Sequence, residues 1–344
     1  MKRNRNNFDV VRLGLALTVV MAHISTLSAV PNLKVLNAIF DSNFAVKGFF
    51  AISGFLVTKS YLTSSGVLEY AEKRLRRIYP AYLTAVVFCL IVGCCVTSLS
   101  FYDFIKSSET LSYIASNALF LNFIQPTLPS VFANQPVKVM NGALWTIKVE
   151  VMLYFCVPFL VALFRKLGSI RTLIFIFILS TSWVYGCKYI FPGEGGAEIA
   201  RQFPGQLAYF GIGSFFAVDD KWLAHTKWLA LISFILLWIF TSPSVKLWLD
   251  PFAYSSIVIF LATDAFRSLN LGRYGDLSYG IYLFHFPLIQ LLVYMNLFDL
   301  SGSFGLVSSL TLSLLMAWIS WHLIEKPFLK RSSHYVTATC WTKS

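Results

Sequence analysis

Two ionisable residues, Arg12 and His23, lie inside the first long apolar run of the chain, residues 8–30. A charged side chain at the centre of a bilayer costs about 2.5–3.5 kcal/mol on insertion scales, so such residues usually face a protein interior and serve a function. The two positions are about three helical turns apart, so both side chains project from one face, about 16 Å apart along the axis. A cation and a proton-transfer group on one face of a membrane helix indicate a catalytic or transport cavity.

Three further polar residues within apolar runs are candidates for the same chemistry. Glu150 is expected at a depth similar to that of His23, where a carboxylate could hold the imidazole tautomer; the alternative is a buried ion pair that joins two helices. His285 is either a site residue or a core hydrogen-bonding residue, and Pro287 beside it frees a backbone carbonyl. Ser53 precedes a glycine, a pattern typical of close helix packing, whereas a serine nucleophile would need a neighbouring base.

A basic segment, residues 72–80, precedes the third expected span. Arg74 and Arg77 lie one turn apart if the segment is helical, and together they could bind phosphate groups bidentately. The alternative is charge that sets the topology or attracts anionic lipid.

The elements that must position these residues are membrane helices. The chain is 57% hydrophobic and 13% charged, with a mean hydropathy of +0.67, which excludes an ordinary soluble domain. Six cysteines, with no metal-type CxxC pair among them, are interpreted as core residues, so no metal site is expected. We predict an all-α, polytopic membrane bundle of about ten transmembrane helices, forming a single domain over residues 1–344. The expected spans are 8–30, 42–62, 79–99, 143–164, 170–191, 204–218, 226–242, 252–267, 275–298 and 304–325.

The formal net charge of +12 would suggest a nucleic-acid partner in a soluble protein. Here most basic residues fall in alternate loops, the positive-inside pattern, so no nucleic acid is expected. This pattern predicts both termini, including a tail over residues 326–344, in the cytoplasm. The stretch 100–142 is then outside, with a short interfacial or re-entrant helix within 111–124 and a loop over 125–136.

These features, in this order, resemble the acyltransferase-3 family of bacterial integral-membrane acyltransferases. The resemblance implies that Arg12 and His23 are essential for acyl transfer and that Arg74 and Arg77 handle the donor. Glu150 and His285 match further family blocks. The blocks that carry the resemblance are FDVVRLGLALTVVMAHIS at 8–25, FFAISGFL at 49–56, RLRRIYP at 74–80, LWTIKVEVMLY at 144–154, SYGIYLFHFP at 278–287 and LIEKPF at 323–328. Many relatives have an acidic residue or proline shortly before the second block, where this chain has Lys47-Gly48, so the acceptor stays open.

The resemblance implies acyl transfer, most often of acetyl, from cytoplasmic acyl-CoA to a hydroxyl of a cell-surface glycan or lipid-linked glycan. O-antigen of lipopolysaccharide or an exopolysaccharide is the expected acceptor, and the bacterial inner membrane, with its lipids as partners, is the expected location. Acetyl-CoA would be a substrate, and no permanently bound cofactor is expected. His23 would act as the general base or accept the acyl group transiently, with Arg12 or backbone donors stabilising the oxyanion.

The same residues are compatible with two other classes of function. A transporter or flippase of a lipid-linked sugar would use Arg12, His23 and Glu150 as substrate or proton contacts. The absence of an evident internal duplication and the cytoplasmic arginines argue against it. A degenerate relative that acts as a sensor or scaffold is disfavoured by the intact motif set.

Overall fold

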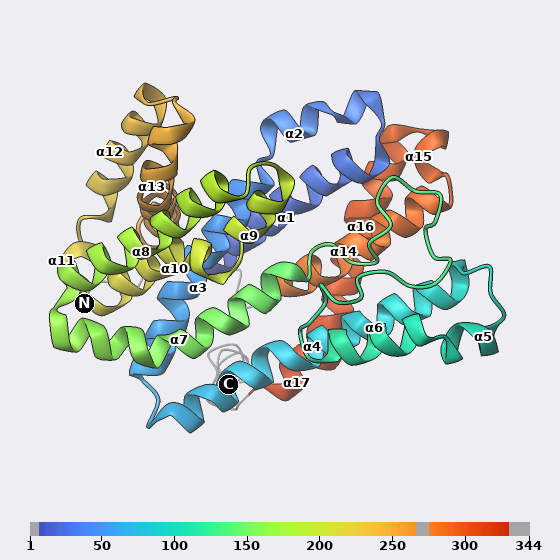
Figure 1. Ribbon diagram of the computed structural model, residues 1–344, viewed down its shortest axis with the longest axis horizontal. Helices are drawn as coiled ribbons and strands as arrows, with labels where there is room; N and C mark the ends of the chain where they lie inside the picture. The colour runs from blue at the N-terminus through green and yellow to red at the C-terminus, as the bar shows by residue number, and fades with distance from the viewer. Residues whose placement is uncertain (1–6, 266–274, 330–344) are drawn as a thin grey trace, which may run out of the picture. The chain divides into compact units, whose positions relative to one another are not determined.

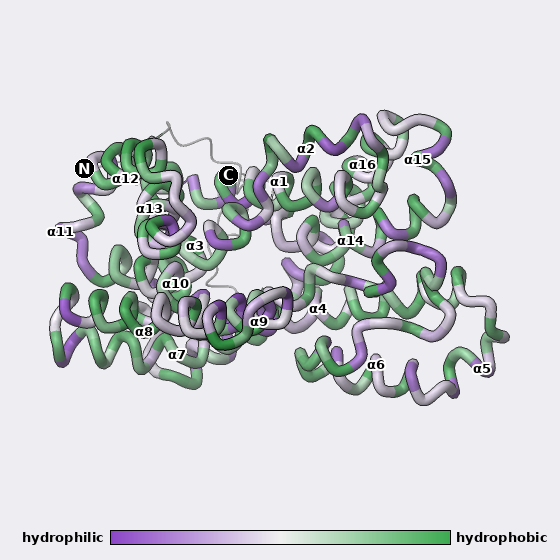
Figure 2. Tube along the Cα trace, turned by 45° about the horizontal axis from the view of Figure 1, so that its top comes forward, coloured by the Kyte–Doolittle hydropathy of each residue, from purple (hydrophilic) through white to green (hydrophobic). Residues whose placement is uncertain are grey.

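The computed structural model describes residues 7–265 and 275–329 (Figure 1). Across these ranges the regular structure is helical and contains no strand. Eight helical segments are long and apolar enough to cross a membrane, and hydrophobic residues dominate them (Figure 2). They are α1 (Phe8–Ser28), Pro31–Leu62 with α2 (Val35–Ile39) and α3 (Ser42–Leu62), α4 (Val67–Val96), α7 (Trp145–Leu167), α8 (Ser169–Ile190), α13 (Pro243–Thr263), α14 (Leu277–Tyr294) and Gly302–Phe328, which begins with α16 (Gly302–Ser320). The all-α, polytopic membrane fold predicted from the sequence is therefore confirmed.

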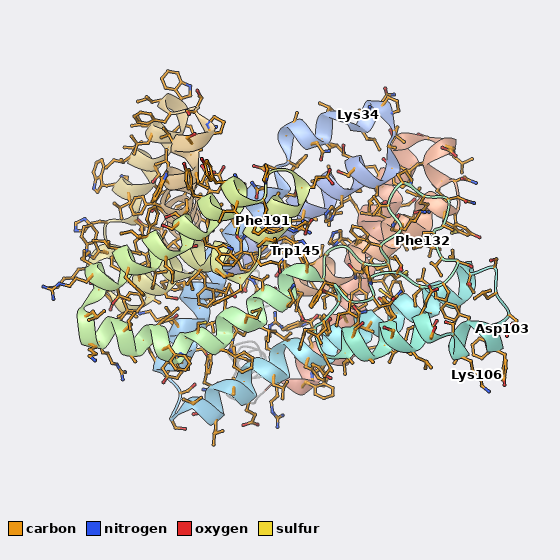
Figure 3. All side chains as sticks on the ribbon, in the orientation of Figure 1. Lys34, Asp103, Lys106, Phe132, Trp145 and Phe191 are labelled. Carbon is orange, nitrogen blue, oxygen red and sulfur yellow. The ribbon has the colours of Figure 1, made fainter. Side chains whose placement is uncertain are left out.

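Large apolar side chains point away from the protein along these helices, as the sticks in Figure 3 show. On α7, which begins at the labelled Trp145, Phe155 and Phe159 are 73% and 75% exposed, one turn apart. Trp238 is 80% exposed. Apolar surface of this extent is stable against lipid and would aggregate in water.

All ten predicted spans fall on helices, but two of these helices are short. They are α10 (Phe203–Val218) and α12 (Thr226–Ile239), of 16 and 14 residues. At about 1.5 Å per residue α12 is about 21 Å long, less than the hydrocarbon core of about 30 Å. In contrast α10 is buried along almost its whole length, so its apolar sequence belongs to a core helix.

Two helix starts differ from the sequence prediction. The third span was expected from residue 79, whereas α4 begins at Val67 and includes the whole basic segment. Similarly α13 begins at Pro243 and not near residue 252. Hydropathy marks only the apolar part of a helix, and a helix continues past it wherever its backbone bonds are satisfied. Arg74 and Arg77 are therefore one turn apart on a helix, as predicted.

The remaining helices are short connections. The sequence predicts a short interfacial or re-entrant helix within residues 111–124. The helix α6 (Ser108–Ala118) covers the first part of this stretch, and the chain from residue 119 to 144 contains no helix. The expected tail, residues 326–344, lies outside the described residues from residue 330 onward, and the single domain stays a prediction. The short elements are η1 (Pro31–Leu33), α5 (Phe101–Lys106), α6 (Ser108–Ala118), α9 (Glu194–Ala200), α11 (Asp220–Leu223), α15 (Leu297–Leu300), η3 (Trp321–Glu325) and α17 (Lys326–Phe328).

The contacts divide the chain into two compact units. The first unit comprises Met1–Leu15, Asn43–Glu72 and Val149–Leu271, and the second comprises Ala16–Ser42, Lys73–Lys148 and Gly272–Ser344. The start of α1, with Arg12, belongs to the first unit, and the rest of α1, with His23, belongs to the second.

In the first unit α3 and α10 cross at glycines. A Cβ atom on Gly54 would lie 2.0 Å from the carbonyl oxygen of Phe210, and one on Gly213 would lie 2.0 Å from that of Ala51. Both distances are far below contact, so only glycine permits this backbone approach. The packing role expected for the glycine after Ser53 is confirmed.

The core of the second unit is α14, whose apolar window is 78% buried. It packs against α16, where Gly280 lies against the backbone of Ala317. The non-helical stretch before α7 also packs on α14, since Gln290 Nε2 donates to the carbonyl oxygens of Val137 (2.7 Å) and Val139 (3.2 Å). This packing on several sides holds α14 firmly, and α14 carries His285.

Candidate active site

The second unit brings His23 of α1 and His285 of α14 into direct contact. His23 Nδ1 lies 2.7 Å from His285 Nε2, and the ring planes are 8° from parallel with centroids 5.0 Å apart. The centroid separation is as long as the nitrogen–nitrogen distance plus the radius of each ring. The two rings therefore lie side by side in nearly one plane and meet edge to edge. The lone pair of a ring nitrogen lies in the ring plane, and the arrangement is therefore a well-aligned hydrogen bond.

A backbone carbonyl determines which nitrogen carries each proton. His285 Nδ1 lies 3.0 Å from the carbonyl oxygen of Ile281, which can only accept, so His285 Nδ1 is the donor. In a neutral ring Nε2 of His285 is then the acceptor, and His23 Nδ1 must donate to it. The proton of a neutral His23 is thereby placed on Nδ1. Its Nε2 is left with a free lone pair, as a general base or nucleophile requires.

A proline on α14 explains how the helix is held beside this pair. Pro287 has no N–H, so the carbonyl of Leu283 loses its helical donor, as the sequence predicts. Asn141 supplies the missing bond, with Nδ2 donating to that carbonyl at 2.9 Å. Its Oδ1 also accepts from the N–H of Ala143 at 3.1 Å. The stretch before α7 is therefore tied to α14 within one turn of His285.

An aromatic ring covers the pair from the side. Phe286 meets the His23 ring edge to face, with centroids 5.2 Å apart at 83°. This position requires Gly142, because a Cβ atom there would lie 2.7 Å from the Phe286 ring. His285 is fully buried and His23 is partly exposed, so His23 is the member of the pair that a substrate can reach.

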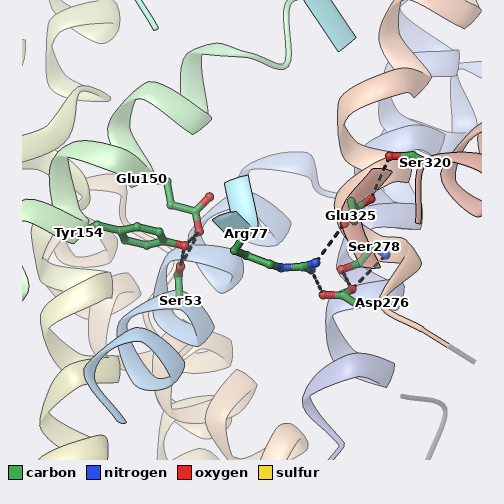
Figure 4. Close-up of polar contacts among 8 residues, drawn as sticks. All are labelled: Ser53, Arg77, Glu150, Tyr154, Asp276, Ser278, Ser320 and Glu325. Carbon is green, nitrogen blue, oxygen red and sulfur yellow. Dashed lines mark hydrogen bonds and ion pairs between the residues drawn. The ribbon is translucent and has the colours of Figure 1, made fainter. Parts of the chain in front are cut away.

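The first unit contains a different polar cluster, built from α3 and α7 (Figure 4). Ser53 Oγ donates to Glu150 Oε1 at 2.5 Å, and the hydroxyl of Tyr154 donates to the same oxygen at 2.6 Å. The two hydroxyl oxygens are 3.2 Å apart. The orientation of His23 by Glu150 stays a prediction: in the first unit one oxygen of this carboxylate accepts from these two hydroxyls, and in the second unit His23 Nδ1 is bonded to His285.

A second proline positions Tyr154. Pro158 of α7 leaves the carbonyl of Tyr154 without its helical donor, and the hydroxyl of Tyr70 donates to that carbonyl at 2.9 Å. Sequence reasoning missed Tyr154, although its position four residues after Glu150 places the two on one helix face.

Arg74 and Arg77 of the basic segment lie in the second unit. Arg77 Nη1 donates to Glu325 Oε2 at 3.0 Å, and its Nη2 donates to Asp276 Oδ2 (Figure 4). Arg74 is one turn earlier on α4 and is half-buried. Asp276 and the contact of Glu325 with Arg77 were not anticipated, because their partner is remote in sequence.

The structure thus joins His23 with His285, Ser53 with Glu150, and Arg77 with two carboxylates. Arg12 is half-buried on the same helix as His23. Their spacing along α1 places the two side chains on one face of that helix.

Comparisons with known proteins identify the family to which the chain belongs. The family model described as an acyltransferase domain matches residues 5–322. A protein named O-acetyl transferase from Shigella phage Sf6 is 24% identical over 95% of this chain and 97% of its own length. Nodulation protein 10 from Rhizobium leguminosarum bv. viciae is 28% identical over 95% of this chain and 94% of its own. No solved structure matches the chain. With a family model that covers nearly all of its residues and with helices of membrane-spanning length, the chain is a multi-pass membrane acyltransferase and belongs to the acyltransferase-3 family.

Proposed function

We propose that the protein transfers an acyl group, acetyl in the first instance, from cytoplasmic acyl-CoA to a hydroxyl of a cell-surface glycan such as O-antigen or an exopolysaccharide. The location is the bacterial inner membrane, with both termini in the cytoplasm. The name of the Shigella phage relative supports the acetyl group and the ester linkage. The bias of basic residues toward alternate loops supports the orientation.

The observation that carries the proposal is the hydrogen-bond chain from the Ile281 carbonyl through His285 to His23. His23 Nε2 takes the proton of the acceptor hydroxyl while the hydroxyl oxygen attacks the thioester carbonyl. The C–S bond breaks, the ester forms, and the CoA thiolate leaves and receives the proton from His23. His285 Nε2 accepts a hydrogen bond from His23 throughout and so stabilises the protonated ring.

The same free nitrogen also suits a covalent route. His23 Nε2 would attack the thioester carbonyl, and the C–S bond would break as the CoA thiolate leaves. The acceptor oxygen would then attack the acyl carbon, the bond from Nε2 to that carbon would break, and the freed Nε2 would take the hydroxyl proton. In either route Arg12, about three turns before His23 on the same face of α1, would orient the donor on its way to His23, and backbone donors near His23 would stabilise the negative charge on the carbonyl oxygen.

The remaining polar groups are assigned to binding the substrates. The basic segment of α4, with Lys73, Arg74 and Arg76, would meet the phosphates of CoA. The Glu150 carboxylate, held through Oε1 by Ser53 and Tyr154, would accept a hydrogen bond from an acceptor hydroxyl through its other oxygen. Glu150 is thus a candidate catalytic group, and Ser53 is a candidate for orienting it.

The test uses purified protein in detergent with radiolabelled acetyl-CoA and a glycan acceptor. We expect labelled acceptor from the wild-type protein and none from His23→Ala at equal folded amount. A flippase would give no labelled product in a single compartment, and that result would overturn the proposal. Full turnover by His23→Ala would remove His23 from the mechanism. The acceptor is found by comparing the masses of surface glycans from deletion and wild-type cells.

A further inference from the structure

We infer that Arg77 is a positioning residue and that Arg74 alone of this pair contacts the donor phosphates. Arg77, Asp276 and Glu325 form what we call the α4–α14–α16 lock, a buried ion-pair group within the second unit. The inference rests on the proposed use of a CoA donor and refines it, since the resemblance would give both arginines the same task.

The geometry of the lock occupies the guanidinium of Arg77. One terminal nitrogen is bonded to Glu325 at 3.0 Å and the other to Asp276. The side chain of Arg77 is 13% exposed, and those of Asp276 and Glu325 are each 1% exposed. Its Cζ atom lies over the rings of Tyr279 and Trp321, 5.6 and 5.7 Å from their centroids. An arginine whose two terminal nitrogens are bonded to carboxylates and whose side chain is largely buried beside two aromatic rings has little surface for a ligand.

Both carboxylates are themselves held in place. Asp276 Oδ1 accepts from the N–H and the hydroxyl of Ser278 at 3.2 and 2.5 Å, which caps the start of α14. Glu325 Oε1 accepts from the hydroxyl of Ser320 at 3.0 Å. These bonds leave one oxygen of each carboxylate for Arg77. The lock is therefore fully hydrogen-bonded, as a buried ionic group must be.

The local backbone is shaped to build the lock. A π-helical turn, Trp321–Glu325, ends α16 and places Trp321 and Glu325 at the guanidinium. Gly275 has φ +104°, and a Cβ atom there would lie 2.1 Å from Nε1 of Trp321. The hydroxyl of Tyr279 donates to the carbonyl of Ile78 at 3.0 Å, a second bond between α14 and α4. These features hold α4 in place directly after Arg74.

Charge decides against a donor role for Arg77. Arg77 is paired with two carboxylates, so its single positive charge is already fully matched and adds no attraction for a phosphate. A phosphate could bind Arg77 only by displacing a carboxylate that would then be buried without a counter-ion. Arg74 lies one turn away on α4, so the fixed helix presents it at a defined place.

The experiment measures the KM for acetyl-CoA, kcat and the thermal unfolding temperature in detergent. Asp276→Asn and Glu325→Gln keep the side-chain shapes and remove one anion each. We expect both to lower the unfolding temperature and to leave the donor KM unchanged or raised. A lower donor KM with an unchanged unfolding temperature would mean that a released Arg77 binds the donor, and it would overturn the inference.

Two further variants complete the test. Arg74→Ala should raise the donor KM by about tenfold or more without changing the unfolding temperature. The triple variant Arg77→Met, Asp276→Asn, Glu325→Gln removes all three charges together and should unfold at a higher temperature than Arg77→Met alone, with a donor KM near that of the wild type. If the triple variant folds but its donor KM is raised as much as in Arg74→Ala, Arg77 contacts the donor and the inference is refuted. If Arg74→Ala keeps the donor KM of the wild type, the proposed donor site is refuted. The unfolding temperatures of the Asp276 and Glu325 variants would still show whether these carboxylates and Arg77 form a stabilising ion-pair group.

Discussion

His285→Ala is the substitution that most directly tests the candidate active site. It removes the acceptor that lies 2.7 Å from His23 Nδ1 and releases the tautomer that the Ile281 carbonyl imposes. His23 Nδ1–H is then a donor without its partner. Leaving a buried donor unsatisfied costs about 1–3 kcal/mol, which corresponds to about 5- to 150-fold in rate. We therefore expect kcat to fall about 10- to 100-fold, with little change in the donor KM.

The assay is acetyl transfer by the purified variant at a matched amount of folded protein. Because His285 is fully buried, its truncation also leaves a cavity. Leu283→Ala is the matched control, since Leu283 is fully buried on the same helix and has no side-chain part in the hydrogen-bond chain. Equal losses of kcat in His285→Ala and Leu283→Ala would assign the effect to packing.

The double variant His23→Ala, His285→Ala gives the decisive comparison. A residue that acts only through His23 adds no loss once His23 is gone, so the double variant should match His23→Ala alone. Multiplied losses, or wild-type kcat in His285→Ala, would refute the hydrogen-bond chain as the source of the base.

Two predictions concern the supports of the site. Gly54→Ala places a Cβ atom 2.0 Å from the Phe210 carbonyl oxygen and should destabilise the protein by about 1–3 kcal/mol. Gly66→Ala is the control, because a Cβ atom there meets open space and should not change the stability. Thermal unfolding in detergent compares the two variants, and equal effects would contradict the close crossing of α3 and α10. Asn141→Ala removes the donor to the Leu283 carbonyl and should lower the free energy of unfolding by about 1–3 kcal/mol. It should also lower kcat, because α14 carries His285. Unchanged stability and unchanged kcat would show that this carbonyl needs no donor.

Several features follow from sequence alone because they depend on local rules. Hydropathy and length predict the membrane helices, and helical periodicity puts Arg12 and His23 on one face of α1. The missing N–H of Pro287 predicts a free carbonyl one turn earlier, which the structure finds paired with Asn141. The family blocks are likewise recognised from their residues and their order in the sequence, without a structure.

Pairing between remote helices was decided only by the tertiary structure. Expected depth in the membrane offers Glu150 as a partner of His23, but depth does not determine which helices are neighbours or how each is rotated. The bond of His23 Nδ1 to His285, 262 residues away in the second unit, is a pairing that depth did not predict. Likewise the spacing of Arg74 and Arg77 correctly predicts two arginines one helical turn apart. Only the fold brings Asp276 and Glu325, 199 and 248 residues away, to Arg77, because a contact between distant segments depends on packing and not on local spacing.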